Sequence, residues 1–137
     1  MHIPTSVLNH IVAHAAAEYP TECCGLLVGQ GDGVVGAAAV RNLRAGERTD
    51  RFEIDPLGHV RVFEAARAAG YSIVGCYHSH PDGMARPSSI DRRLARRFGG
   101  PFGYLVLAIQ GEGDCQVYTG MIGTDGEIEP VPLETQA

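Results

Sequence analysis

The residues best suited to chemistry lie between positions 78 and 91. His78 and His80 supply two imidazoles, Ser88 a hydroxyl and Asp91 a carboxylate. A catalytic zinc site holds its metal with three protein ligands of these types and leaves one position open for water. The residue types and their number therefore fit a catalytic zinc site.

The spacing supports the same interpretation. His78 and His80 end an apolar stretch that reads as a strand, where side chains at i and i+2 share a face about 6.5 Å apart. Taken alone, a His-x-His pair can arise by chance, and Ser88 with Asp91 three residues later is a good helix capping box. Because both features occur within one loop of each other, we favour a metal site in which Asp91 supplies the third ligand.

Two further residues must be weighed against this site. Cys76 shares the face of His78 and His80, but an extended strand puts it about 13 Å from His80, so burial as a small core residue is favoured. Glu22 precedes a short apolar run. The residues alone leave open whether it is a boundary residue or a functional carboxylate.

The remaining pattern predicts the elements that must position these residues. A helix capped by Thr5 or Ser6 is expected to end before Pro20, because apolar residues recur at helical spacing. Asp55 and Pro56 predict the start of a second helix that ends at Gly70. We expect that helix to turn Leu57, Val60, Phe63 and Ala66 inward.

Strands are expected between and after these helices. A third, short helix should begin at Ser88 and end at Gly99-Gly100. The expected strands cover Cys23–Val28, Val34–Val40, Arg51–Ile54, Ser72–His78, Tyr104–Ile109 and Cys115–Met121, with a last short strand after Asp125-Gly126. Residues 134–137 read as a frayed tail. The sequence thus predicts one α/β domain over residues 1–137, an α-β sandwich with a central mixed sheet flanked by helices.

Composition excludes several classes of protein. The chain has 137 residues, a formal net charge of −5 and no Lys, which makes it a weak candidate for binding nucleic acid. No apolar run approaches the roughly 20 residues of a membrane span, and no secretory signal is visible. Cys23, Cys24, Cys76 and Cys115 read as reduced, buried thiols, although a disulfide remains open. We expect a cytoplasmic protein.

The motifs together resemble a known family. The stretch Glu22-Cys23-Cys24-Gly25-Leu26-Leu27-Val28-Gly29, the stretch Phe52-Glu53-Ile54-Asp55-Pro56, and Gly75-Cys76-Tyr77-His78-Ser79-His80-Pro81 with Ser88 and Asp91 are similar to those of JAMM (MPN+, JAB1/MPN/Mov34) metalloproteases. The resemblance spans nearly the whole chain and points to the compact, single-domain prokaryotic type. It implies an MPN/JAB fold, which is cytidine-deaminase-like, although the motifs of zinc deaminases are absent.

The resemblance also implies the roles of the site residues. His78, His80 and Asp91 would bind one Zn²⁺ per chain, Glu22 would be the general base, and Ser88 would stabilise the oxyanion. The implied activity is that of a metallo(iso)peptidase that cleaves after the C-terminal Gly-Gly of a ubiquitin-like or sulfur-carrier protein. Its tail would add as a strand in a groove framed by residues 82–86 and 41–50, close to Ser79.

Alternatives remain at this stage. The chain could be a catalytically silent MPN scaffold that only binds protein partners, and a cysteine hydrolase using Cys76 with His78 is a weaker third possibility. His10 and His14 lie one helical turn apart and read as a solvated face. A cluster of arginines reads either as a solvated helix face or as a docking patch for an acidic carrier, and comprises Arg92, Arg93, Arg96 and Arg97.

Overall fold

The computed structural model describes residues 1–45, 51–97 and 100–137. In chain order, the helices and strands of these ranges are β1 (His2–Pro4), α1 (Thr5–Glu18), β2 (Cys24–Gln30), β3 (Gly33–Val40), α2 (Pro56–Ala68), β4 (Ser72–Pro81), α3 (Ser89–Ala95), β5 (Phe102–Ile109), β6 (Cys115–Ile122), β7 (Ile128–Pro130) and β8 (Glu134–Gln136).

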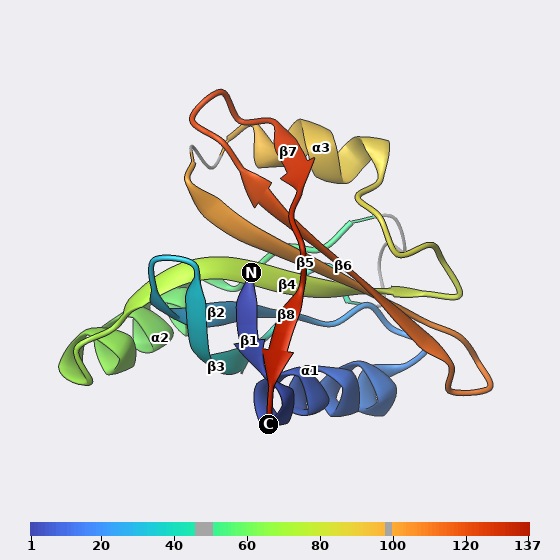
Figure 1. The fold of residues 1–137 in the computed structure, drawn as a ribbon. Coiled ribbons are helices and arrows are strands. Elements are labelled where there is room, and N and C mark those ends of the chain that lie inside the picture. Colours follow the sequence, from blue (N-terminus) through green and yellow to red (C-terminus); the bar gives the residue numbers. More distant parts are fainter. Residues whose placement is uncertain (46–50, 98–99) are drawn as a thin grey trace.

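Within the described ranges, the strands form one eight-stranded sheet in the order β7-β6-β5-β4-β2-β3-β1-β8. Strand β4 runs parallel to β5 and antiparallel to β2, and β1 is parallel to both of its neighbours. The sheet is therefore mixed, as the sequence predicted. It curls, and α1 and α3 lie on opposite sides of it (Figure 1).

The alternation of β4 divides the core in two. Tyr77 packs into a cluster on the α1 side, together with Ile11 and Ala15 of that helix. Cys76 packs into a second cluster, which includes Ala95 of α3 and is contacted by Val62 of α2. Because successive residues of a strand face opposite ways, β4 carries one row of side chains into each cluster.

The two long helices confirm their predicted positions but not every detail. Helix α1 begins at Thr5, where no side chain caps it, so the predicted Thr5 or Ser6 cap is wrong. Helix α2 begins as predicted, because the Asp55 side chain accepts a hydrogen bond from the Leu57 amide and Pro56 occupies the first turn.

The predicted inward face of α2 is largely wrong. Leu57, Val60 and Phe63 are 57 %, 51 % and 51 % exposed, and only Ala66 of the predicted set is buried. Val62 and Ala66, which are one turn apart, face the sheet instead. The small Ala66 side chain lets the helix lie close to the strands, and the larger residues remain on its outer side.

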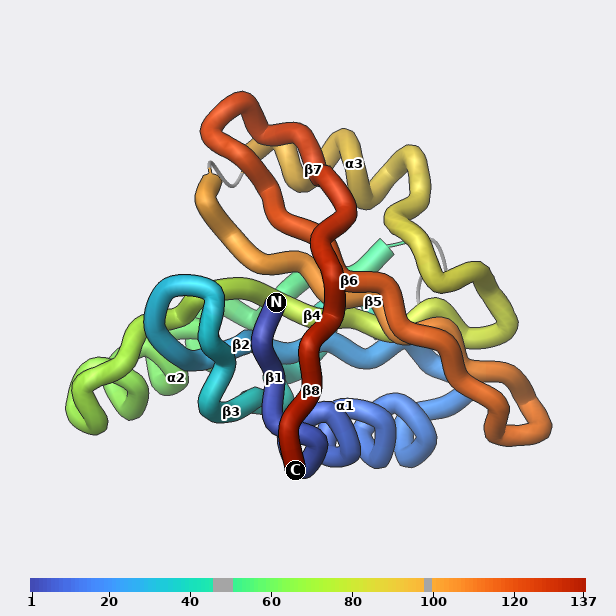
Figure 2. The backbone as a smooth tube through the Cα atoms, viewed as in Figure 1, coloured from blue at the N-terminus to red at the C-terminus, as the bar shows by residue number. Residues whose placement is uncertain are grey.

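The two chain ends form an edge of the sheet that the sequence did not predict. Strand β8 pairs in parallel with β1, so that Ile3 faces Thr135, and residues 134–137 are not a frayed tail. The Met1 amino group donates a hydrogen bond to the Pro132 carbonyl. The two terminal strands lie side by side (Figure 2).

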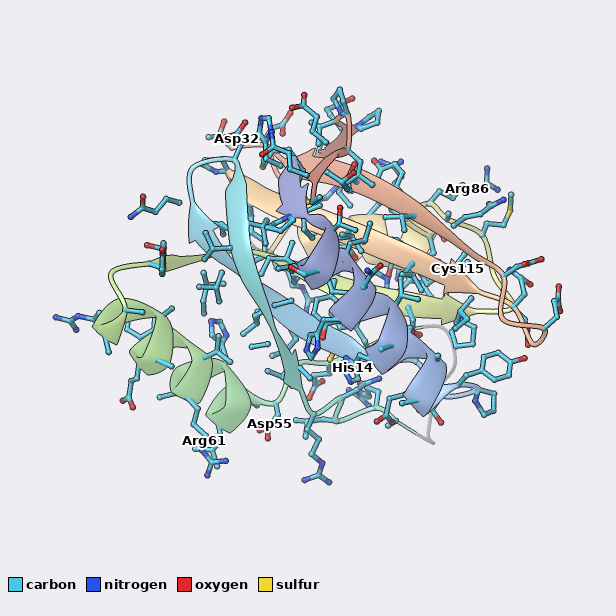
Figure 3. The ribbon with its side chains drawn as sticks, turned by 60° about the horizontal axis from the view of Figure 1, so that its bottom comes forward. His14, Asp32, Asp55, Arg61, Arg86 and Cys115 are labelled. Atoms are coloured by element: carbon cyan, nitrogen blue, oxygen red, sulfur yellow. The ribbon has the colours of Figure 1, made fainter. Side chains whose placement is uncertain are left out.

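Two smaller expectations also fail. Residues 51–54 form no strand, only an isolated bridge between Ile54 and Asn42. Cys23, Cys24 and Cys76 are buried free thiols as predicted, but Cys115 is exposed at the outer end of the β5–β6 hairpin (Figure 3). No helix in the described part of the chain is long and apolar enough to cross a membrane.

Candidate metal centre and active site

Strand β4 positions the two histidines. It lies between β2 and β5, with His78 opposite Cys24 on one side and Val106 on the other. The side chain of His78 is fully buried and that of His80 is 16 % exposed. The two rings project from the same face, and their Nε2 atoms lie 3.0 Å apart.

Helix α3 supplies the carboxylate through its first turn. Ser88 caps the helix by accepting a hydrogen bond from the Asp91 amide at 3.0 Å, and its own amide donates to Asp91 Oδ2 at 2.9 Å. This capping box fixes Asp91 so that Oδ2 lies 3.2 Å from Nε2 of His78 and 3.0 Å from Nε2 of His80. The residues that cap α3, Ser88 and Asp91, are therefore the same residues that place a carboxylate beside the two imidazoles.

These three atoms fit a metal ion. At zinc bond lengths of 2.0–2.1 Å, two ligand atoms of a tetrahedral site lie about 3.3 Å apart, close to the separations of His78, His80 and Asp91. Asp91 Oδ1 is buried and has no hydrogen-bond partner within the described residues. A buried carboxylate oxygen without a partner is costly, and a bound cation would offset that cost.

A second, overlapping set of donors includes Glu22. One ligand atom from each of Glu22, His78 and His80 lies within 4.8 Å of the others, so this group could also hold a metal ion. Glu22 Oε1 is 3.9 Å from His78 Nε2, however, which is farther than Asp91 Oδ2. The tighter triangle is thus the one that contains Asp91, and Glu22 stands beside it.

The two imidazoles are oriented in different ways. Nδ1 of His80 lies 2.9 Å from the Met84 carbonyl, which can only accept, so this nitrogen carries a proton and Nε2 is the nitrogen that faces His78 and Asp91. Nδ1 of His78 is buried and has no hydrogen-bond partner among the described residues. Stacking holds that ring instead, with Phe52 at a centroid distance of 4.2 Å and Tyr104 edge-on at 5.4 Å.

Burial and hydrogen bonding set the charges of the three groups. Burial lowers the pKa of His78, which keeps that imidazole neutral. Burial acts in the same direction on His80, but hydrogen bonds to Asp91 and to the Met84 carbonyl outweigh it and raise its pKa. For Asp91, burial opposes ionisation, and hydrogen bonds from the two imidazoles overcome it and hold the pKa of the carboxyl well below its usual range.

Glu22 lies two residues before β2 and is 6 % exposed. The Asn42 side chain donates to its carbonyl oxygen at 3.0 Å, and the next amide, that of Cys23, donates to Ser79 Oγ at 2.8 Å. These bonds fix the Glu22 backbone to its neighbours. Its side chain lines a hollow of about 220 Å³ together with His80 and Ser88. A buried carboxylate beside a metal site is suited to proton transfer.

Ser88 borders the same hollow. Its Oγ accepts the Asp91 amide through a lone pair, which leaves its hydroxyl proton available to a second group. The residue can therefore cap α3 and donate a hydrogen bond at the same time. Ser79, by contrast, is fully buried, its Oγ accepts a hydrogen bond from the Cys23 amide, and it is not among the residues that line this hollow.

The other residues that the sequence offered as candidates differ in their burial and contacts. Cys76 is fully buried in the α3-side core, and burial raises the pKa of its thiol far above the usual value, which removes it as a nucleophile. His10 is exposed as predicted. His14 is not part of a solvated face, because it is partly buried and its Nδ1 lies 2.8 Å from the Tyr77 hydroxyl (Figure 3).

Two of the four clustered arginines make side-chain contacts with the segment around β7. Arg92 donates to the Ile128 carbonyl at 3.1 Å and Arg96 pairs with Glu127 at 3.0 Å, so both tie α3 to the turn around β7. Arg93 and Arg97 are exposed.

Two residues support the site in a way that the sequence did not predict. Asn42 bonds the Glu22 carbonyl and also accepts from the amides of Arg44 and Glu53, so it ties the segment after β3 to the carboxylate. Phe52 stacks on His78. Each partner lies many residues away in the chain, and the sequence placed Phe52 only in an expected strand and in the family motif.

Comparison with known proteins decides the family. The profile of prokaryotic homologs of the JAB domain (Prok-JAB) matches residues 4–122. The chain belongs to this family. Its fold agrees with the resemblance read from the sequence.

Named relatives extend this finding. The chain is 38 % identical over 117 residues to the desampylase of Haloferax volcanii, an alignment that covers 84 % of this chain and 82 % of that protein. It is 32 % identical over 96 residues to a probable TtuB-protein conjugate cleaving protease of Thermus thermophilus, covering 70 % and 64 %. A solved structure from Desulfitobacterium hafniense matches with a TM-score of 0.83 at 27 % identity, covering 98 % of this chain and 92 % of that one.

Proposed function

We propose that residues 1–137 form one domain that is a zinc-dependent metallo(iso)peptidase. It would cleave after the C-terminal Gly-Gly of a ubiquitin-like or sulfur-carrier protein. The observation that carries the proposal is the triangle of His78, His80 and Asp91, with the buried Glu22 carboxylate 3.9 Å from His78. Named relatives that cleave protein conjugates support the substrate class.

We assign His78, His80 and Asp91 as the zinc ligands. Zinc, when bound, would supply Lewis acidity and lower the pKa of a water to about 7. Glu22 is then the general base, because a nearby carboxylate suffices to take a proton of that acidity. Its burial beside His80 and Ser88 keeps it at the place where a scissile carbonyl would lie.

The other residues act on the substrate. The Ser88 hydroxyl donates to the oxygen of the scissile carbonyl, where negative charge develops. Glu22 passes the proton that it took to the departing amine, which completes the hydrolysis. The narrow hollow beside Ser88 and Gly83 favours a tail of small residues, as Gly-Gly provides. Of the predicted frame, residues 41–43 and 45 line the hollow of about 250 Å³ beside Glu22, and Gly83 lines the hollow that contains Ser88. Residues 46–50 lie outside the described residues.

The three buried free thiols fit a reducing compartment, so the proposal places the protein in the cytoplasm. The partner would be a small carrier protein rather than a nucleic acid or a membrane.

The test combines metal content with cleavage. Purified protein should hold one zinc per chain by elemental mass spectrometry, and His78→Ala should not. Zinc-loaded protein should release a reporter fused after a carrier that ends in Gly-Gly, with linear, lysine-linked and single-amino-acid adducts assayed side by side. Glu64→Gln, a change of the same type at an exposed position of α2, is the control for Glu22→Gln. Equal cleavage by Glu22→Gln would refute the assigned base. Zinc binding with no cleavage of any adduct would favour the silent scaffold.

A further inference from the structure

One exposed carboxylate joins three segments of the chain beside the metal site. Asp82 follows the last residue of β4, and both of its carboxylate oxygens accept a hydrogen bond. Oδ2 accepts from the Tyr19 hydroxyl at 2.7 Å, and Oδ1 accepts from the Gly111 amide at 3.0 Å. Tyr19 is the residue after α1, and Gly111 lies in the β5–β6 hairpin. These three segments meet at one end of the sheet (Figure 1).

The backbone of Asp82 gives the loop after β4 its direction. Among the described residues, Asp82 is the one residue other than glycine with a positive φ, of 55°. Its amide donates to the Ile109 carbonyl at 2.7 Å, and the next amide, that of Gly83, donates back to the His80 carbonyl at 3.2 Å. A left-handed conformation is unfavourable for most side chains and persists where surrounding contacts hold it. The two bonds to the carboxylate are such contacts.

The loop that turns at Asp82 carries the partner of a proposed metal ligand. The Met84 carbonyl accepts a hydrogen bond from Nδ1 of His80 at 2.9 Å. The β5–β6 hairpin holds the loop a second time just before Met84, because the Gln110 side chain donates to the Gly83 carbonyl at 3.1 Å. The position of the Met84 carbonyl, and with it the orientation of the His80 ring, therefore depends on a loop that Asp82 ties to its surroundings.

The other bond of the carboxylate leads to the proposed general base. Tyr19 lies three residues before Glu22 in the chain. Glu22 and His80 line the same hollow of about 220 Å³, whereas Asp82 is not among its lining residues. Asp82 is thus connected to both residues by short stretches of chain without bordering the place where a substrate would lie.

We propose that Asp82 is a positioning residue that fixes the His80 ring and the segment carrying Glu22 relative to each other. The inference rests on the proposed function, in which His80 binds zinc and Glu22 is the base. Asp82 is exposed, as are both of its hydrogen bonds, and water can replace such bonds at little cost to the fold. Loss of the carboxylate should therefore disturb the geometry of the site more than the stability of the protein.

Three variants test the proposal. Asp82→Gly removes the carboxylate and keeps the left-handed backbone, which Gly adopts readily. Asp82→Asn tolerates the same backbone and can keep both contacts, because its side-chain oxygen accepts from the Gly111 amide and its amide group donates to the Tyr19 oxygen. The control is Asp125→Gly, which removes an exposed carboxylate that accepts the Glu127 amide at 3.0 Å in the turn between β6 and β7.

The first measurement needs neither metal nor substrate. In metal-free protein labelled with ¹⁵N-histidine, the bond to Met84 should protect the Nδ1 proton of His80 from exchange and give a resolved NMR signal at low temperature. Asp82→Gly should lose this signal to exchange with water, whereas Asp82→Asn and Asp125→Gly should retain it. Retention of the signal in Asp82→Gly would overturn the proposal.

Zinc affinity and kinetics provide the second measurement. Competition with a chelator should show zinc binding about tenfold weaker in Asp82→Gly, the lower end of the range for groups that support metal ligands. With zinc saturating, kcat on a Gly-Gly fusion should also fall about tenfold, because a small misplacement of reacting groups is costly, while KM changes less than about twofold. Asp82→Asn and Asp125→Gly should stay within about twofold of the wild type. Equal losses in Asp82→Asn and Asp82→Gly would mean that the charge acts rather than the hydrogen bonds, and would overturn the positioning role.

A further variant covers the case in which Asp82→Gly does not fold. Tyr19→Phe removes one hydroxyl and cuts only the connection to Glu22. Its kcat should fall about threefold with zinc affinity unchanged, and a kcat equal to that of the wild type would overturn the proposal.

The same data separate this inference from the proposed function. If the wild type neither binds zinc nor cleaves any adduct, while the His80 proton responds to Asp82 as stated, the proposed function fails and the positioning of His80 stands. Cleavage by the wild type, with the same His80 signal and zinc affinity in every variant, would do the reverse.

Discussion

The two faces of strand β4 differ in the side chains that they carry and in what those side chains contact, although both belong to the same short stretch of chain. On the α1 side, Tyr77 is fully buried, its hydroxyl bonds His14, and its ring lies so close to Gly25 that a Cβ there would overlap it. On the α3 side, Cys76 and His78 are equally buried. His78, however, carries a polar ring whose Nε2 atom faces the Asp91 carboxylate.

The difference shows how the ring of a proposed metal ligand, His78, can be held without a hydrogen bond at its second nitrogen. Ligating histidines usually donate their second ring nitrogen to a partner. His78 has no such partner among the described residues, and aromatic stacking from Phe52 and Tyr104 replaces it. We expect substitutions on the α3 side to reduce activity more than stability. Substitutions on the α1 side should reduce stability more than activity.

The largest expected effect is that of Glu22→Gln on catalysis. Loss of a general base typically costs about 10²–10⁴ in rate, so kcat on a Gly-Gly fusion should fall by that factor. The melting temperature should change by only a few degrees, since the amide nearly matches the shape of the carboxylate. Steady-state kinetics with thermal unfolding of the same preparations checks both. A large drop in melting temperature with kcat unchanged would reverse the expected contrast.

The opposite result is expected for Tyr77→Ala. Removing a large buried aromatic side chain typically costs about 3–5 kcal/mol of unfolding free energy, through lost burial and the cavity left behind. Tyr77→Phe should cost only about 1 kcal/mol, because it deletes the hydrogen bond to His14 and keeps the ring. Urea unfolding measures both variants. At temperatures where Tyr77→Phe remains folded, its kcat should equal that of the wild type; a hundredfold loss would assign the α1 side a chemical function.

A smaller effect is expected at Phe52, whose ring packs against the proposed metal ligand His78. Phe52→Ala removes the ring that stacks on His78, so zinc affinity should fall about tenfold, at the lower end of the range for groups that support metal ligands. Phe52→Tyr keeps the stacking and should retain most of the affinity. Competition with a chromogenic chelator measures both. Unchanged zinc affinity in Phe52→Ala would show that β4 alone orients His78.

The sequence predicted what is local and missed what depends on tertiary contacts. His78 and His80 share a strand, and Asp91 belongs to a capping box, so each could be placed from a few neighbouring residues. Phe52 and Asn42 act on residues 26 and 20 positions away in the chain. No local pattern encodes those contacts. Glu22 was found only because the family resemblance linked it to the histidines.

Helix α2 and the chain ends show the same limit. Helical spacing identified α2 correctly, but both Leu57 with Val60 and Val62 with Ala66 form apolar pairs at helical spacing. Which pair faces the sheet depends on how closely the helix can approach the strands. Strand β8 is fully exposed in its side chains, so burial gives no alternation to detect, and only pairing with β1 makes it a strand.

The smallest effect concerns thiols and tests whether the two faces are equally closed. Cys23 and Cys24 are buried, on the α1 side and the α3 side respectively, and burial raises their pKa values to about 11 and about 12. Because the thiolate is the reactive form, both should resist alkylation at neutral pH, as should Cys76. Cys115 is exposed and should react alone. Mass spectrometry after brief iodoacetamide treatment should therefore show one adduct, absent in Cys115→Ser.

Early labelling of Cys24 or Cys76, with Cys23 protected, would mean that the α3 side opens more readily than the α1 side. The stacked packing behind His78 would then be a dynamic support for the metal ligand rather than a rigid one.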